Sequence, residues 1–143
     1  MTNKYFSEIE KVEEAKGVEC VPSDKYMRTI REAYRWTFSE ISNPQNFLPR
    51  ALINDNPRIE KSKMKCEGWS LSFYDTEENA LNKFNSYRKN KPNIDKKLGT
   101  HLAKGILEES DGYCGKVNRD GHFEFFESIN CDLSSKFEII SKL

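Results

Sequence analysis

One stretch decides the fold: Trp69-Ser70-Leu71-Ser72-Phe73-Tyr74-Asp75-Thr76, followed by Glu77-Glu78-Asn79-Ala80-Leu81 and the aromatic residues Phe84 and Tyr87. From Trp69 to Phe73, apolar side chains alternate with serines, which is typical of a half-buried strand. The apolar spacing then changes to three or four residues, as on one face of an amphipathic helix, and Asp75 or Thr76 can cap its start. Residues 68–89 are therefore predicted to form a strand, a tight turn and a helix.

The chain before this stretch is predicted to be mainly helical. Residues 4–16 carry an apolar residue every third position and end at Gly17, a residue that often terminates helices. Pro22-Ser23-Asp24 is a helix-start signal, and Met27 and Ile30 follow it at helical spacing. From Tyr34 the period could change to two, so residues 34–38 fit either a helix or a strand. Residues 42–66 are rich in turn-forming residues and are predicted to be irregular.

The C-terminal half is predicted to be rich in strands. Strand patterns cover residues 98–107, 113–117, 122–127 and 137–140, and Asp-Gly turns precede the second and third of them. Helices and strands are segregated along the chain, which indicates an α+β class. We expect a single domain over residues 1–143, with a helical N-terminal third, then a mostly antiparallel sheet with one helix packed on it. The first helix, within residues 1–17, could be peripheral.

Composition excludes several classes of protein. The chain has 143 residues, with 23 basic and 23 acidic side chains and a formal net charge of zero, which argues against a general polyanion binder. It contains no apolar run near the about 20 residues that span a bilayer. Its polar, acidic start gives no sign of a secretion signal, so we expect a cytoplasmic protein with no membrane contact.

The four cysteines, Cys20, Cys66, Cys114 and Cys131, form no C-x-x-C pair, and the chain has two histidines. Zinc sites usually draw two ligands from one short segment, so no metal site is expected. Reduced thiols, some of them buried as small apolar residues, are the expectation for a cytoplasmic chain.

Two side chains on the strand 122–127 are candidates for catalysis. His122 titrates near neutral pH and could act as a general acid or base, or it could bind the preceding turn as a structural residue. Glu124 lies two residues further on and therefore shares its face. Glu127 differs from Glu124 by three positions and points to the opposite face of a regular strand.

Four other residues are candidates for ligand binding. Ser70, Ser72 and Tyr74 form either an ordinary solvent face or one wall of a cleft. Arg35, between Tyr34 and Trp36, could bind an anion through its planar fork of donors. Arg50 and Arg58, on the irregular loop, are alternatives to Arg35.

These residues together resemble the ADP-ribosyltransferase superfamily over about 60 positions of the chain. An arginine on an early strand, a Ser-x-Ser strand that runs into a helix, and a glutamate on a later strand are the shared features. The resemblance implies that Arg35 binds the phosphates or ribose of NAD, that Ser70 or Ser72 lines the nicotinamide pocket, and that Glu124 is the catalytic carboxylate. Two motifs depart from the pattern, since Ser-Leu-Ser replaces Ser-Thr-Ser and no Glu-x-Glu occurs. More loosely, the chain resembles small uncharacterised bacterial proteins.

Three functions follow as hypotheses. The first is a small binding or accessory protein that needs no cofactor and acts through a protein partner, docked on the amphipathic N-terminal helix. The second is an NAD-consuming enzyme similar to ADP-ribosyltransferases. The third is nucleic-acid binding through the basic residues 88–97, which are predicted to form a solvated loop. The neutral overall charge disfavours this third function.

Overall fold

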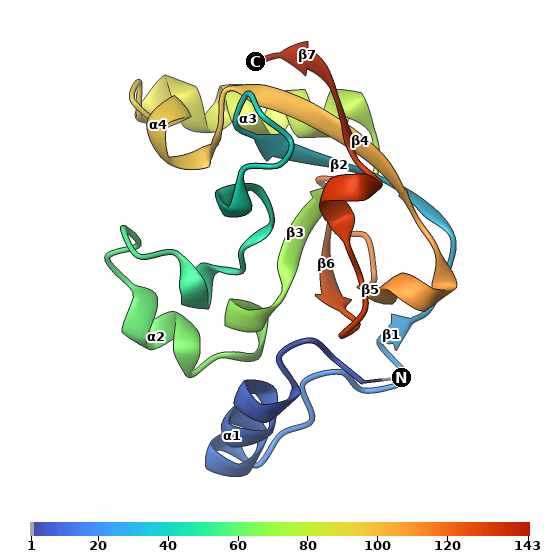
Figure 1. Cartoon of the computed structure of the whole chain (residues 1–143). Helices are drawn as coiled ribbons and strands as arrows, with labels where there is room; N and C mark the ends of the chain where they lie inside the picture. The colour runs from blue at the N-terminus through green and yellow to red at the C-terminus, as the bar shows by residue number, and fades with distance from the viewer. Residues whose placement is uncertain (1) are drawn as a thin grey trace.

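The computed structural model describes residues 2–143, which form four α-helices and one seven-stranded antiparallel sheet (Figure 1). The helices are α1 (Phe6–Lys16), α2 (Ile59–Lys63), α3 (Glu77–Asn90) and α4 (Asp95–Leu98). The strands are β1 (Tyr26–Met27), β2 (Arg31–Thr37), β3 (Leu71–Tyr74), β4 (His101–Leu107), β5 (Gly112–Gly115), β6 (His122–Glu127) and β7 (Glu138–Lys142). Their order in the sheet is β1-β5-β6-β3-β2-β4-β7. The predicted α+β class and the antiparallel sheet are confirmed.

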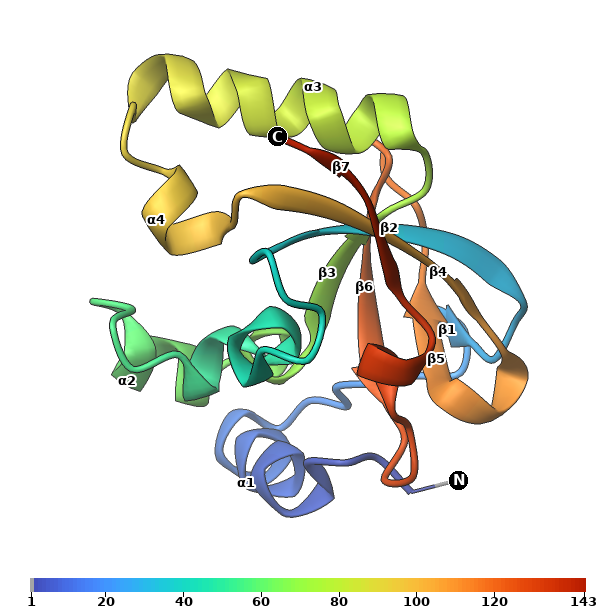
Figure 2. The same cartoon turned by 45° about the horizontal axis from the view of Figure 1, so that its top comes forward.

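The strand, turn and helix predicted from residue 68 to residue 89 are present as β3 and α3. The Thr76 hydroxyl accepts a hydrogen bond from the Asn79 N–H at 3.1 Å and caps the helix. Buried Ala80 and Phe84 turn the helix toward the sheet, where Phe84 packs edge-on against Trp36 of β2. Helix α3 packs against β2 and β3 at one end of the molecule (Figure 2).

The prediction of a helical N-terminal third is only partly correct. The helix predicted over residues 4–16 is α1, which ends at Gly17 in the left-handed conformation with φ of 65°. The second predicted helix is wrong, because β1 and β2 occupy that region. Pro22 accepts backbone hydrogen bonds that make a turn, and β2 then pairs with β4 along its whole length. Ile30, which suggested helical spacing, is 70% exposed.

Helix α1 lies at the opposite end of the molecule from α3 (Figure 1). Its side chains Ile9 and Val12 are 4% and 1% exposed and belong to a cluster with Trp69 and Phe126. The expectation of one helix on the sheet is therefore incomplete. Trp69 itself lies in a 3₁₀ turn, Cys66–Trp69, so β3 begins two residues later than the alternation suggested.

Strands β2 and β3 diverge soon after they meet. They share the single paired position Tyr34–Tyr74, whereas β2 and β4 pair over seven residues and β3 and β6 over four. Figures 1 and 2 show β2 and β4 running across the direction of β3 and β6. The main core fills one side of this bent sheet and contains Phe73, Phe123, Phe125 and Phe137. The divergence leaves an opening beside β3.

The segment 42–66 contains short helical turns, Pro44–Phe47 and Arg50–Leu52, in addition to α2. The basic residues 88–97, predicted as a loop, are largely helical, because α3 continues to Asn90 and α4 follows. Arg88 pairs with Asp95 at 3.1 Å between these helices. Each helix found within residues 2–143 is too short or too polar to span a bilayer.

The composition predicted four reduced cysteines, and this prediction is wrong for two of them. Cys20 and Cys66 form a disulfide that links the segment after α1 to the 3₁₀ turn before β3. The two residues are 46 positions apart in sequence, and packing of α1 against that turn brings them together. Cys114 and Cys131 are free and buried, and burial raises the pKa of these thiols to about 11 and about 12.

Candidate functional site

A cleft of about 440 Å³ opens where β2 and β3 diverge, between the irregular loop and helix α3. This volume lies within the range of small-molecule sites in proteins. All six residues predicted from the sequence line it: Arg35, Ser70, Ser72, Tyr74, His122 and Glu124. They come from three strands and from the residue before β3, so the fold brings together positions that are far apart in the chain.

The pairing of β3 with β6 makes the polar floor of the cleft. Ser72 lies opposite Glu124, and Tyr74 lies opposite His122. Phe73 and Phe123 alternate with them and enter the core on the other face. The predicted alternation in the two strands therefore places the polar side chains on one face, as the sequence indicated.

His122 is held at two points. Its backbone N–H donates to Asn118 Oδ1 at 3.0 Å, and its Nε2 lies 2.9 Å from Ser72 Oγ, within hydrogen-bonding distance. Burial lowers the pKa of the imidazole, and the positive charges of Lys83 and Arg50 lower it further. The ring is therefore neutral at pH 7 and can accept a proton. His122 therefore both binds the preceding turn, as a structural residue would, and lines the cleft, as a catalytic residue would.

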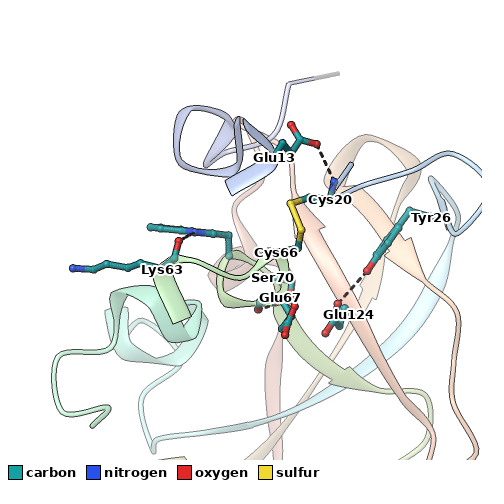
Figure 3. The surroundings of a disulfide bond; sticks show 9 residues. Glu13, Cys20, Tyr26, Lys63, Cys66, Glu67, Ser70 and Glu124 are labelled. Atoms are coloured by element: carbon teal, nitrogen blue, oxygen red, sulfur yellow. Dashed lines mark hydrogen bonds between the residues drawn. A yellow bond between two sulfur atoms is a disulfide. The ribbon is translucent and has the colours of Figure 1, made fainter. Parts of the chain in front are cut away.

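Glu124 is half-buried in the cleft and accepts a hydrogen bond from the phenol O–H of Tyr26 at 3.0 Å (Figure 3). Burial raises the pKa of this carboxyl, the hydrogen bond from Tyr26 lowers it, and the nearby charge of Glu67 raises it again. Glu127, the second glutamate of β6, lies outside the cleft, where it is 4% exposed and forms an ion pair with Lys4. Glu124 is therefore the carboxylate of this strand that a ligand can reach.

Arg35 holds the wall of the cleft together. Its guanidinium donates to the backbone carbonyls of Asn46 at 2.7 Å, Ser72 at 2.8 Å and Leu48 at 3.5 Å, which join the irregular loop to β3. Burial lowers the pKa of Arg35 to about 10, so the side chain keeps its charge at neutral pH. A guanidinium has five N–H donors, and these contacts use three of them.

Ser70 has a structural contact as well. Its hydroxyl donates to the Glu67 carbonyl at 2.9 Å, and the side chain is 7% exposed. This bond closes the 3₁₀ turn beneath the cleft. Ser72 is the more exposed of the two serines and offers its hydroxyl, shared with His122, to the cleft.

Several cleft residues were not predicted. Lys83 and Tyr87 of α3 lie one helical turn apart, and Tyr87 packs edge-on against Trp36, which stacks on Tyr74. The four-residue spacing of Lys83 and Tyr87, which puts them on one face of the helix, was the sequence signal that could have identified them. Of the two arginines considered as alternatives to Arg35, Arg50 lines the cleft and Arg58 lies outside it. Lys97 of α4 adds a further cation.

Glu67 is the carboxylate that sequence reasoning missed. It follows Cys66 directly, so the disulfide to Cys20 ties its backbone to the N-terminal segment. Figure 3 shows Glu67 and Glu124 on the same side of this bond, near Tyr26. Neither a motif nor a periodicity marks Glu67, which lies on the 3₁₀ turn Cys66–Trp69.

Taken together, the cleft combines an aromatic wall, the three carboxylates of Glu67, Asp120 and Glu124, a neutral imidazole and several cations. Comparison with protein-family models, with curated proteins and with solved structures found no significant match to this chain.

Proposed function

We propose that the cleft binds a nucleotide of the NAD class and breaks the bond between nicotinamide and its ribose. The observation that supports the proposal is the meeting of Arg35, Ser72, His122 and Glu124 in one cleft. Arg35, Ser72 and Glu124 are the residues that carry the resemblance to ADP-ribosyltransferases, and His122 is the candidate acid or base beside them. Their convergence is what such an enzyme requires.

The chemistry of the lining fits the parts of a dinucleotide. The aromatic rings of Trp36, Tyr74 and Tyr87 in the cleft wall suit packing against a planar base. Arg50 and Lys83 lie on the His122 side of the cleft, where Lys83 is paired with Asp120 at 3.5 Å, so Arg50 is the cation there that suits a phosphate. Carboxylate and hydroxyl oxygens on the floor suit the hydroxyl groups of a ribose.

Cleavage of NAD needs a negative group beside the ribose. When the C1′–N bond breaks, both electrons leave with nicotinamide, which departs as a neutral molecule, and the ribose becomes an oxocarbenium ion. The carboxylate of Glu124 would stabilise this cation in a partly desolvated site, where electrostatic interactions are strong. Water or an acceptor side chain then attacks C1′, and the neutral His122 can take the proton released by that nucleophile.

Nicotinamide release tests the proposal. The purified protein is incubated with NAD, and nicotinamide is measured by chromatography. We expect release by the wild-type protein and loss of at least about 100-fold in Glu124→Gln, in line with the loss of one preorganised electrostatic group. Glu138→Gln, on the exposed edge strand β7, is the matched control and should keep full activity. No release from the wild-type protein, or equal release from both variants, would contradict the proposal.

The hypothesis of a protein partner on the N-terminal helix stays a prediction. The apolar residues Ile9 and Val12 of α1 are buried within this chain, and Phe6 is the large apolar residue of that helix that remains exposed, at 51%. The nucleic-acid hypothesis also stays a prediction, and one of its basic side chains, Arg88, is already paired with Asp95. No comparable convergence of residues supports either function, so the cleft is the better basis for a proposal.

A further inference from the structure

Tyr26 reaches Glu124 from a distant part of the chain. It lies on β1, an edge strand of two residues, and its phenol O–H donates to Glu124 Oε2 at 3.0 Å across 98 positions of sequence. We propose that Tyr26 is a positioning residue, which holds the Glu124 carboxylate ionised and in one orientation at the cleft. This inference rests on the proposed function, in which Glu124 acts on the substrate.

The ring of Tyr26 is fixed on several sides. It packs edge-on against buried Phe126 with ring centroids 5.3 Å apart, and its backbone pairs with Gly115 of β5. A Cβ atom at Gly115 would lie 2.9 Å from the ring, so glycine makes room for it there. A ring held in this way delivers its hydroxyl to one point, which gives the hydrogen bond a defined geometry.

The surroundings of Glu124 explain why it needs such a donor. Glu67, from the 3₁₀ turn, adds negative charge, and burial removes water, so both disfavour ionisation of Glu124. Tyr26 opposes them by donating to the charged form. On the other sides lie Ser72 of β3 and His122 of the same strand. Further charged side chains of the cleft are Arg35 of β2, Arg50 of the loop, Lys83 of α3, Lys97 of α4 and Asp120 of the turn before β6.

The hydrogen bond from Tyr26 makes the two carboxylate oxygens of Glu124 different. Tyr26 binds Oε2, which leaves Oε1 for a substrate hydroxyl. Tyr26 acts through Glu124 rather than on the substrate itself. Its removal should therefore change the pH at which the carboxylate is available, in addition to any change in the maximal rate.

Tyr26→Phe tests this inference, because the variant keeps the ring and its packing. Tyr113→Phe is the matched control, since Tyr113 lies on β5 in the same apolar cluster. Two quantities are measured in the full chain: the titration midpoint of the Glu124 carboxyl by carbon-13 NMR, assigned with Glu124→Gln, and the pH profile of nicotinamide release. In Tyr26→Phe we expect the midpoint and the acidic limb of the profile to rise together by about one pH unit, which is the effect of one charge-assisted hydrogen bond. In Tyr113→Phe neither should move.

The two readouts separate the possible failures. An active Tyr26→Phe variant with an unchanged Glu124 titration and an unchanged acidic limb would overturn this inference alone. A uniform loss of activity at every pH, with no change of titration, would show a merely structural role and would overturn it as well. If the wild-type protein releases no nicotinamide, the proposed function fails, and this inference fails with it.

Discussion

His122 Nε2 on β6 and Ser72 Oγ on β3 lie 2.9 Å apart. The contact runs diagonally between the strands, because Tyr74 lies directly opposite His122 and Glu124 lies directly opposite Ser72. The contact links the two sides of the polar floor. It requires the two strands to pair in this register, since a shift by one residue would send Ser72 into the core. The imidazole is therefore tied to the opposite strand as well as to its own turn.

This contact gives a pH-dependent effect of His122→Gln on stability. The pKa of His122 is lower in the folded protein than its ordinary 6.5. The unfolded chain therefore binds this proton first, and the wild type loses stability as the pH falls below about 6.5. At pH 8 the variant should be about 1 kcal/mol less stable through loss of the contact with Ser72. At pH 5 this deficit should shrink.

Urea unfolding at the two pH values measures the deficit, with His101→Gln, on β4 outside the cleft, as the control for loss of an imidazole. A deficit of the variant that grows as the pH falls would show that the folded protein prefers protonated His122, against this account.

Phe73→Ala should destabilise the protein strongly. The side chain is fully buried and packs against Phe123, Phe125 and Phe137, so its removal leaves a cavity in the main core. We expect a loss of about 3–5 kcal/mol in the free energy of unfolding, measured by chemical denaturation. The matched control is Phe6→Ala, because Phe6 is 51% exposed, and it should cost less than about 1 kcal/mol. Equal losses in the two variants would contradict the assigned core.

The Cys20–Cys66 disulfide should stabilise the fold. It closes a loop of 46 positions, and the chain-entropy argument gives a contribution of about 3–4 kcal/mol. A phosphine reductant should lower the urea midpoint of the wild type. It should leave the double variant Cys20→Ser/Cys66→Ser unchanged.

A count of thiols in denaturant checks the state of the cysteines independently. The oxidised protein should expose two thiols, Cys114 and Cys131, and the reduced protein four. Four thiols in protein purified without reductant would rule the disulfide out.

Arg35→Lys should loosen the loop that forms one wall of the cleft. A lysine cannot keep the three contacts of the planar guanidinium with the carbonyls of Asn46, Leu48 and Ser72. We expect a loss of about 1–3 kcal/mol in stability and faster hydrogen exchange at the amides of Phe38 and Leu52, whose bonds involve this loop. Arg58→Lys, an exposed change outside the cleft, is the control. Unchanged exchange in Arg35→Lys would show that the loop is held by other contacts.

The sequence predicted those parts of the fold in which local pattern and tertiary packing agree. In β3 and α3, the apolar residues that repeat in the sequence are the ones that become buried, such as Phe73 and Phe84. In β1 and β2, local pattern and tertiary packing disagree. Met27 of β1 and Ile30, just before β2, fit helical spacing but are exposed, and β2 is specified by its pairing with β4, about 70 positions later in the chain. Such a partner leaves no local signal.

The candidate site divides in the same way. Alternation alone puts Ser72 with Tyr74, and His122 with Glu124, on one face of their strands. Strand register joins these two faces into one floor, and Tyr26 reaches Glu124 from β1, an edge strand in a segment whose spacing predicts a helix. Glu67 lies on a 3₁₀ turn next to a disulfide whose two cysteines are 46 positions apart and match no motif.

NMR tests the binding of a nucleotide at the cleft directly, without relying on cleavage of NAD. Carbocyclic NAD, whose ribose ring oxygen is replaced by a methylene group so that no oxocarbenium ion can form, is titrated into nitrogen-15-labelled wild-type protein. We predict saturable amide shifts for residues 70–74 and 122–124, with residues 138–142 of β7 unchanged as an internal control. No shifts at millimolar ligand, or shifts confined to residues outside the cleft, would contradict the account.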